Sequence, residues 1–207
     1  MGTSAQVAVV VALALALYAL LQFAFPKAPE SVKVGVPFLA LPLAAIVLLR
    51  KAPDLGRLDR TLLFSAAAYA PFAAVAAAAA PSAAWFYAPL AATLGSLSAA
   101  LWWAVDTFVH VGAVDFFTKR VVQREAEARW GAWKAVWVQL AVWSAGHVLE
   151  WTWLRLILGD VFAAAYLVAA GVVTGLAYLR WKNVGGLMFG HFLVNVSAAI
   201  SAVWLYG

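Results

Sequence analysis

Polar residues that can carry out acid–base chemistry lie within three apolar stretches of this sequence. Asp115, His147 and His191 each interrupt a separate hydrophobic run, and Asn195 follows His191 by four positions. An ionised side chain at the centre of a bilayer costs roughly 2.5–3.5 kcal/mol, so such residues normally face a bundle interior and have a partner or a task. Carboxylate and imidazole groups transfer protons, and imidazole and amide N–H groups stabilise an oxyanion. The residue types therefore predict one shared polar site.

The spacing within each stretch indicates which side chains act together. His191 and Asn195 are four residues apart, so on a helix they lie on one face and can donate to one point. The same two side chains could instead join neighbouring helices. Glu150 follows His147 by one turn and lies on nearly the same face, so these two residues form either a satisfied pair or a part of the site.

The elements that hold these residues must be membrane-spanning helices. Hydrophobic residues make up 66% of the 207 positions and charged residues 11%, against about 45–50% and about 25% in soluble domains. This composition predicts an all-α, polytopic transmembrane bundle that is in contact with membrane lipid. The net charge of +5 does not indicate nucleic-acid binding, because the basic residues cluster in loops between apolar runs. The absence of cysteine excludes disulfides and thiolate metal sites.

The apolar runs predict about seven spans, each of which needs about 20 residues to cross the hydrocarbon. Residues 1–84 hold the first three spans and residues 85–207 hold the last four. The first run is interpreted as a span, because Pro26 and Lys27 follow it in place of the cleavage site of a signal peptide. The predicted spans are Ser4–Phe25, Val34–Leu49, Thr61–Ala80, one within the longer helix Phe86–Arg129, Trp133–Trp153, Val161–Leu179 and Val184–Tyr206. The excess of the long helix, residues 119–129, projects past the membrane or lies along its interface and belongs to the fourth loop.

Loop charge predicts the orientation of the bundle. Eleven of the 14 lysines and arginines lie in the second, fourth and sixth loops. The positive-inside rule makes these loops cytoplasmic, which predicts an integral protein of the cell membrane with its N-terminus in the cytoplasm. At about 1.5 Å per residue from the flanking basic residues, Asp115, His147 and His191 lie at depths of roughly 14, 20 and 14 Å. A common depth is what a shared site requires.

Together the motifs resemble those of the CAAX protease and bacteriocin-processing (CPBP) family of intramembrane endopeptidases. They read Asp115 with Arg120, then Trp143-x-x-x-His147, then His191-x-x-x-Asn195, and the resemblance covers about residues 85–207. It implies that this part of the chain is the catalytic core.

The first motif departs from the family pattern, which is Glu-Glu-x-x-x-Arg. Alignment on Arg120 places Asp115 at the first glutamate and Phe116 at the second, and this is the preferred alignment. An alternative alignment places Val114 and Asp115 at the two glutamates and Lys119 at the arginine. In either alignment one of the two carboxylates is missing, and Glu150 is a candidate replacement.

The resemblance implies hydrolysis of a peptide bond with water as the nucleophile. In that mechanism Asp115 is the general base, His147 assists it, and His191 and Asn195 stabilise the oxyanion. Arg120 and Glu150 have supporting roles. No metal or other cofactor is expected, although one carboxylate and two histidines could bind zinc. The implied substrate is a membrane-associated protein or peptide, such as a prenylated C-terminal tail or a bacteriocin-like precursor.

Two other classes of function fit the residues. A non-catalytic relative, with a binding or immunity role, would account for the missing carboxylate. A proton-coupled transporter would use the intramembrane acids and histidines as a relay, but the two halves of the sequence show no repeat of helix pattern. Asp106 and His110, four residues apart, are interpreted as a structural pair outside the site.

Overall fold

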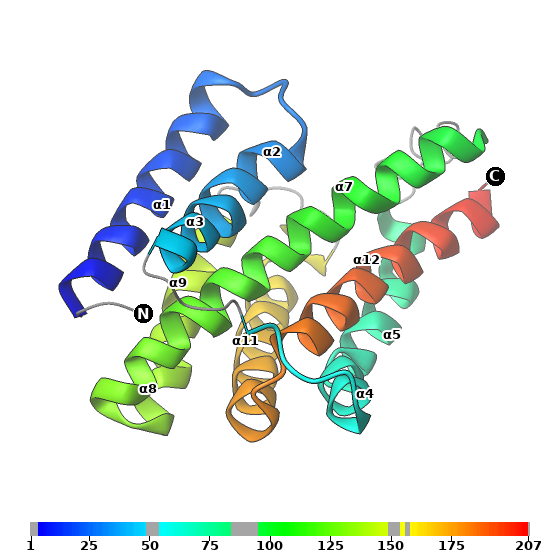
Figure 1. Ribbon diagram of the computed structural model, residues 1–207. Helices are drawn as coiled ribbons and strands as arrows, with labels where there is room; N and C mark the ends of the chain where they lie inside the picture. The colour runs from blue at the N-terminus through cyan, green and yellow to red at the C-terminus, as the bar shows by residue number, and fades with distance from the viewer. Residues whose placement is uncertain (1–3, 49–53, 84–94, 149–153, 156–157, 207) are drawn as a thin grey trace.

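The computed structural model describes residues 4–48, 54–83, 95–148, 154–155 and 158–206, and these residues form helices without a strand (Figure 1). Three short helical segments over residues 30–48 continue into one another. In chain order the elements are α1 (Ser4–Ala24), α2 (Glu30–Gly35), η1 (Val36–Ala40), α3 (Leu41–Leu48), α4 (Arg60–Ala67), α5 (Ala70–Ala79), η2 (Ala80–Ala83), α7 (Leu97–Asp115), η3 (Phe116–Gln123), α8 (Arg124–Trp130), α9 (Ala132–His147), α11 (Asp160–Trp181) and α12 (Val184–Tyr206).

Five described stretches are long and apolar enough to cross a membrane, and the bent pair of α4 and α5 adds a sixth if it is counted as one span. The five are Ala5–Ala24, Glu30–Leu48, Leu97–Trp130, Asp160–Trp181 and Val184–Leu205. The predicted span over residues 133–153 coincides with α9 as far as His147, and residues 149–153 lie outside the described part of the chain. The prediction of an all-α, polytopic integral membrane protein is confirmed.

The long element that carries the first motif is a continuous helix of 34 residues formed by α7, η3 and α8. Figure 1 shows it running diagonally across the molecule beside α12. Its middle part, η3, is π-helical, a form that is rare and often found at functional sites. Asp115 is the last residue before η3, and all eight residues of η3 are buried. The widened turn therefore follows directly after the acid of the site.

A bend between α4 and α5 brings a tyrosine into the bundle. Pro71, in the first turn of α5, has no N–H to donate and its ring clashes with the carbonyl four residues earlier. The two helices consequently meet at an angle of 40°. Tyr69 lies in this bend and is only 3% exposed.

Glycines allow α12 to pack against the backbone of α4. A Cβ atom on Gly186 would lie 2.7 Å from the carbonyl oxygen of Leu62, and one on Gly190 would lie 2.6 Å from that of Ala66. Side chains cannot occupy these positions, so the small residues permit a close approach of the two helices. This packing fixes the distance between His191, the next residue on α12, and the bend that contains Tyr69.

The three loops predicted to lie on one side of the membrane contact one another. Asn183 donates from Nδ2 to the carbonyl oxygen of Arg57 at 2.8 Å, and Lys182 forms a salt bridge with Glu127. The structure thus brings the second, fourth and sixth loops to the same end of the bundle. Their cytoplasmic location remains a prediction.

Candidate active site

Asp115 is the centre of a buried polar network. Its side chain is fully buried, and its Oδ2 lies 3.0 Å from Nδ1 of His191. The hydroxyl of Tyr69 lies 2.8 and 2.9 Å from the two carboxylate oxygens, and Nζ of Lys119 lies 3.4 Å from Oδ1. A buried charge needs such partners, because an unpaired one would be strongly destabilising. Both carboxylate oxygens are therefore engaged by protein donors.

The basic partner of Asp115 is Lys119, one turn later on the same helix. Arg120, which the preferred alignment expects in a supporting role, instead donates from Nε to the carbonyl oxygen of Asp54 at 2.9 Å. Lys119 is fully buried and lies 5.1 Å from the ring centre of Trp143. The observed pairing is the one expected from the alternative alignment, in which Lys119 takes the place of the arginine.

The contact with Asp115 determines the tautomer of His191. A carboxylate only accepts hydrogen bonds, so Nδ1 of His191 must carry the proton that it donates. In the neutral imidazole, Nε2 is then the nitrogen that can take up a further proton. The ring of His191 also stacks on that of Tyr69, with 4.9 Å between centroids and 15° between planes. Both the tautomer and the orientation of this imidazole are thereby fixed.

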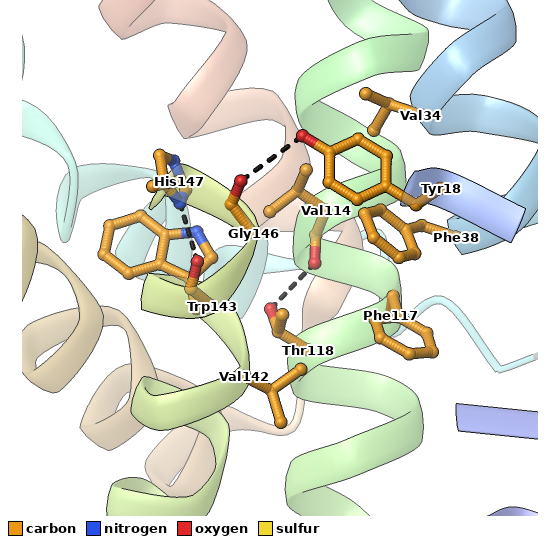
Figure 2. Close-up of a pocket in the computed structure, with 10 residues that line it drawn as sticks. All are labelled: Tyr18, Val34, Phe38, Val114, Phe117, Thr118, Val142, Trp143, Gly146 and His147. Atoms are coloured by element: carbon orange, nitrogen blue, oxygen red, sulfur yellow. Dashed lines mark hydrogen bonds between the residues drawn. The ribbon is translucent and has the colours of Figure 1, made fainter. Parts of the chain in front are cut away.

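His147 is fixed in a similar way at the end of α9, as Figure 2 shows. Its Nδ1 lies 2.7 Å from the carbonyl oxygen of Trp143, so Nδ1 donates and Nε2 is the acceptor of the neutral ring. The rings of His147 and Trp143 pack edge to face, with centroids 4.5 Å apart. Next to this histidine, Tyr18 donates its hydroxyl hydrogen to the carbonyl oxygen of Gly146 at 3.3 Å.

Three of the four predicted catalytic residues meet at one cavity of about 80 Å³. His147, His191 and Asn195 all contribute to its wall, although they belong to two different helices and to separate motifs. Asp115 does not line the cavity and lies behind His191. The polar residues of the wall are Tyr69, His110, His147, Tyr166, His191 and Asn195.

The placement of Asp115 bears on the role expected from the resemblance. A general base must come within hydrogen-bond reach of the water that it activates. Asp115 has no exposed surface, and its oxygens are engaged by Tyr69, Lys119 and His191. The geometry therefore suits a carboxylate that orients the imidazole of His191 and stabilises its protonated form. It does not suit a carboxylate that contacts water directly.

Asp106 and His110, interpreted as a structural pair, lie in different surroundings. Asp106 accepts hydrogen bonds from the backbone N–H of Ser31 at 3.2 Å and from the hydroxyl of the same residue. His110 lines the cavity together with His147 and His191. α2 thus supplies a partner of Asp106, and the pairing of Asp106 with His110 stays a prediction.

Two further expectations from the sequence concern a replacement for the missing acid and a possible metal site. Glu150 lies outside the described residues. Among the residues that the structure describes, no group of three or more His, Cys, Asp or Glu side chains could hold a metal ion. The described wall of the cavity also contains no acidic residue, and Val114 occupies the wall position just before Asp115.

Sequence reasoning missed Tyr69 and Tyr166, and it considered Lys119 only in the alternative alignment. The i, i+4 spacing of Asp115 and Lys119 was a usable signal for their ion pair. Pro71 indicated a bend, but nothing local showed that Tyr69 would reach the acid of another helix. Tyr166 carries no signal within α11 that separates it from the other residues of that helix.

Fold and site together define a polytopic helical membrane protein with a histidine-lined cavity inside its bundle. Residues 96–197 match the family described as Type II CAAX prenyl endopeptidase Rce1-like. This part of the chain belongs to the CAAX protease family, as the three motifs predicted. No curated protein and no solved structure matches the chain. The match lies within the predicted core of residues 85–207, whose N-terminal boundary falls outside the described residues and stays a prediction.

Proposed function

We propose that this protein is an intramembrane endopeptidase in which His191, backed by Asp115, activates a water molecule in the cavity. The observation that carries the proposal is the contact of 3.0 Å between a fully buried carboxylate and an imidazole that lines the cavity. A carboxylate in this position holds the imidazole in the tautomer that accepts a proton and stabilises the imidazolium that forms. The family match supports proteolysis as the type of reaction.

The proposed reaction proceeds by addition of water to the carbonyl carbon of a peptide bond. His191 takes one proton from the water as the oxygen attacks, and the resulting imidazolium then donates that proton to the leaving amine. The amide of Asn195, one turn further along α12, is the donor that the cavity offers to the developing oxyanion. His147, whose Nε2 is an acceptor, can hold the water or the N–H of the substrate.

The substrate that fits this proposal is a membrane-associated protein or peptide. The family description points to prenylated proteins as one class, and the sequence resemblance adds bacteriocin-like precursors. The grouping of the basic loops at one end of the bundle supports a cell-membrane protein that receives its substrate from the cytoplasmic side, with the N-terminus in the cytoplasm.

A cleavage assay with purified protein in lipid vesicles tests the proposal. Replacing the base in His191→Gln is expected to lower kcat by about 10²–10⁴-fold, the usual contribution of general acid–base catalysis. Asp115→Asn is expected to lower kcat strongly because it removes the negative charge that stabilises the imidazolium. Asp106→Asn is the matched control, because this acid lies on the same helix and bonds to Ser31 away from the cavity. Full activity of His191→Gln would contradict the proposal.

A second function has a specific observation in its favour. Because no described residue of the cavity wall is acidic, the chain could be a non-catalytic relative that binds a membrane peptide. The two proposals differ in the outcome of Val114→Glu, which places a carboxylate on the cavity wall at the position that the alternative alignment gives to the first glutamate of the family. If the chain is non-catalytic, this variant is expected to gain hydrolysis that the parent protein lacks. If the parent protein already cleaves the peptide, the second function is excluded.

A further inference from the structure

We infer that Tyr69 is a positioning residue of the site, and that it acts on His191 through Asp115. This inference rests on the proposed function and extends it to the N-terminal part of the chain. The family match begins at residue 96, so Tyr69 lies outside the part of the sequence that matches. The bend between α4 and α5 nevertheless places Tyr69 against both Asp115 and His191.

Two contacts of different kinds tie Tyr69 to the pair. Its hydroxyl lies 2.8 and 2.9 Å from the two oxygens of Asp115. Its ring lies parallel to that of His191, with centroids 4.9 Å apart. The hydroxyl fixes the rotation of the carboxylate, and the ring fixes the plane of the imidazole. A donor in a buried network of this kind acts more strongly than one in water, because the local dielectric is low.

The geometry separates this role from simple packing. Asp115 has three donors around it, and two of these, Lys119 and His191, bring a full or potential charge. Tyr69 brings none, so its hydroxyl holds the carboxylate without adding a further positive charge beside it. Without the hydroxyl, the carboxylate can rotate towards Lys119, and the contact with Nδ1 of His191 lengthens. The first step affected would be proton uptake by His191.

The test is Tyr69→Phe in the full-length protein, which removes the hydroxyl and keeps the ring. The control is Tyr178→Phe, since Tyr178 is a buried tyrosine on α11 that contacts Lys182 at the loop end of the bundle, away from the cavity. With ¹⁵N-labelled histidine, the imidazole signals of His191 are expected to change in Tyr69→Phe and not in Tyr178→Phe. In the cleavage assay, kcat is expected to fall about tenfold, which corresponds to one lost hydrogen bond to a charged group, with KM unchanged.

Unchanged ¹⁵N signals of His191 in Tyr69→Phe would overturn the inference, and so would a full kcat. The NMR readout needs no substrate, so it separates failure of this inference from failure of the proposed protease activity. The same substitution in an Asp115→Asn background is expected to cause no further loss of kcat, and an additional tenfold loss would show that Tyr69 acts independently of the acid. Should Tyr69→Phe fail to fold, Asp115→Asn with ¹³C-labelled tyrosine decides: the ring signals of Tyr69 are expected to shift, and unchanged signals would overturn the inference.

Discussion

Substitution of Gly190 by alanine is expected to disturb the site from outside it. The new Cβ would lie 2.6 Å from the carbonyl oxygen of Ala66, 2.9 Å from its Cα and 3.0 Å from Cδ2 of Tyr69. Ordinary contacts begin at 3.4 Å, and the closest neighbours are backbone atoms that cannot rotate away. The helix α12 must therefore move from α4 by nearly 1 Å, an estimate from the difference between these distances.

This displacement moves His191, the residue next to Gly190, relative to Tyr69 and Asp115. A misplacement of about 1 Å can cost about 10²-fold in rate, and overpacking of a well-packed interior costs about 1–3 kcal/mol of stability. We expect Gly190→Ala to remain folded, with a lower thermal midpoint and a kcat reduced by about 10²-fold.

The matched control is Gly112→Ala, which lies on α7 and faces the same helix α12. Its Cβ would meet Cε of Met188 at 2.8 Å, and this is the flexible end of a side chain that can turn aside. The assays are peptide cleavage in vesicles and thermal unfolding in detergent. A Gly190→Ala variant as active as Gly112→Ala would refute the claim that the packing of α12 on α4 positions the site.

Three further predictions concern the framework of the bundle. Gly175→Ala places a Cβ 2.7 Å from Nε2 of Gln139, which donates to the carbonyl oxygen of Gly171, so thermal unfolding is expected at a lower temperature. Arg120→Gln is expected to lower the thermal midpoint but to leave cleavage largely intact, because Arg120 bonds to a loop carbonyl and not to Asp115. Asp59 is the N-cap of α4, and hydrogen bonds from Thr61 hold its pKa below the ordinary value of 3.8. The stability that Asp59 contributes is therefore present at neutral pH and is lost as the pH falls below about 4. The difference in thermal midpoint between Asp59→Ala and the parent protein should therefore be larger at pH 7 than at pH 3.

The arrangement of helices followed from simple physical signals in the sequence. Long apolar runs can only be satisfied as helices in a membrane, because each backbone polar group must find a partner within the chain. The i, i+4 spacing of His191 and Asn195 was sufficient to place both on one wall of the cavity. The basic loops also met at one end, as their charges indicated.

The parts of the site that the sequence did not predict depend on contacts between helices. Tyr69 reaches Asp115 only because a proline bends the chain by 40° and glycines bring α12 close. Arg120, within the π-helical segment η3, donates to the carbonyl oxygen of a loop residue, and local propensities indicate neither the π-helix nor this contact. The sequence was enough to predict where a residue lies along its helix. Packing between helices decided which residue of another helix its side chain contacts.

The most direct test of the central claim is a double-mutant cycle on kcat with Asp115→Asn and His191→Gln. If the buried carboxylate acts by supporting the imidazole, each single substitution lowers kcat strongly, and the double variant is no slower than His191→Gln alone. Losses that simply multiply would show that the two residues act independently. Full activity of Asp115→Asn would contradict the account outright.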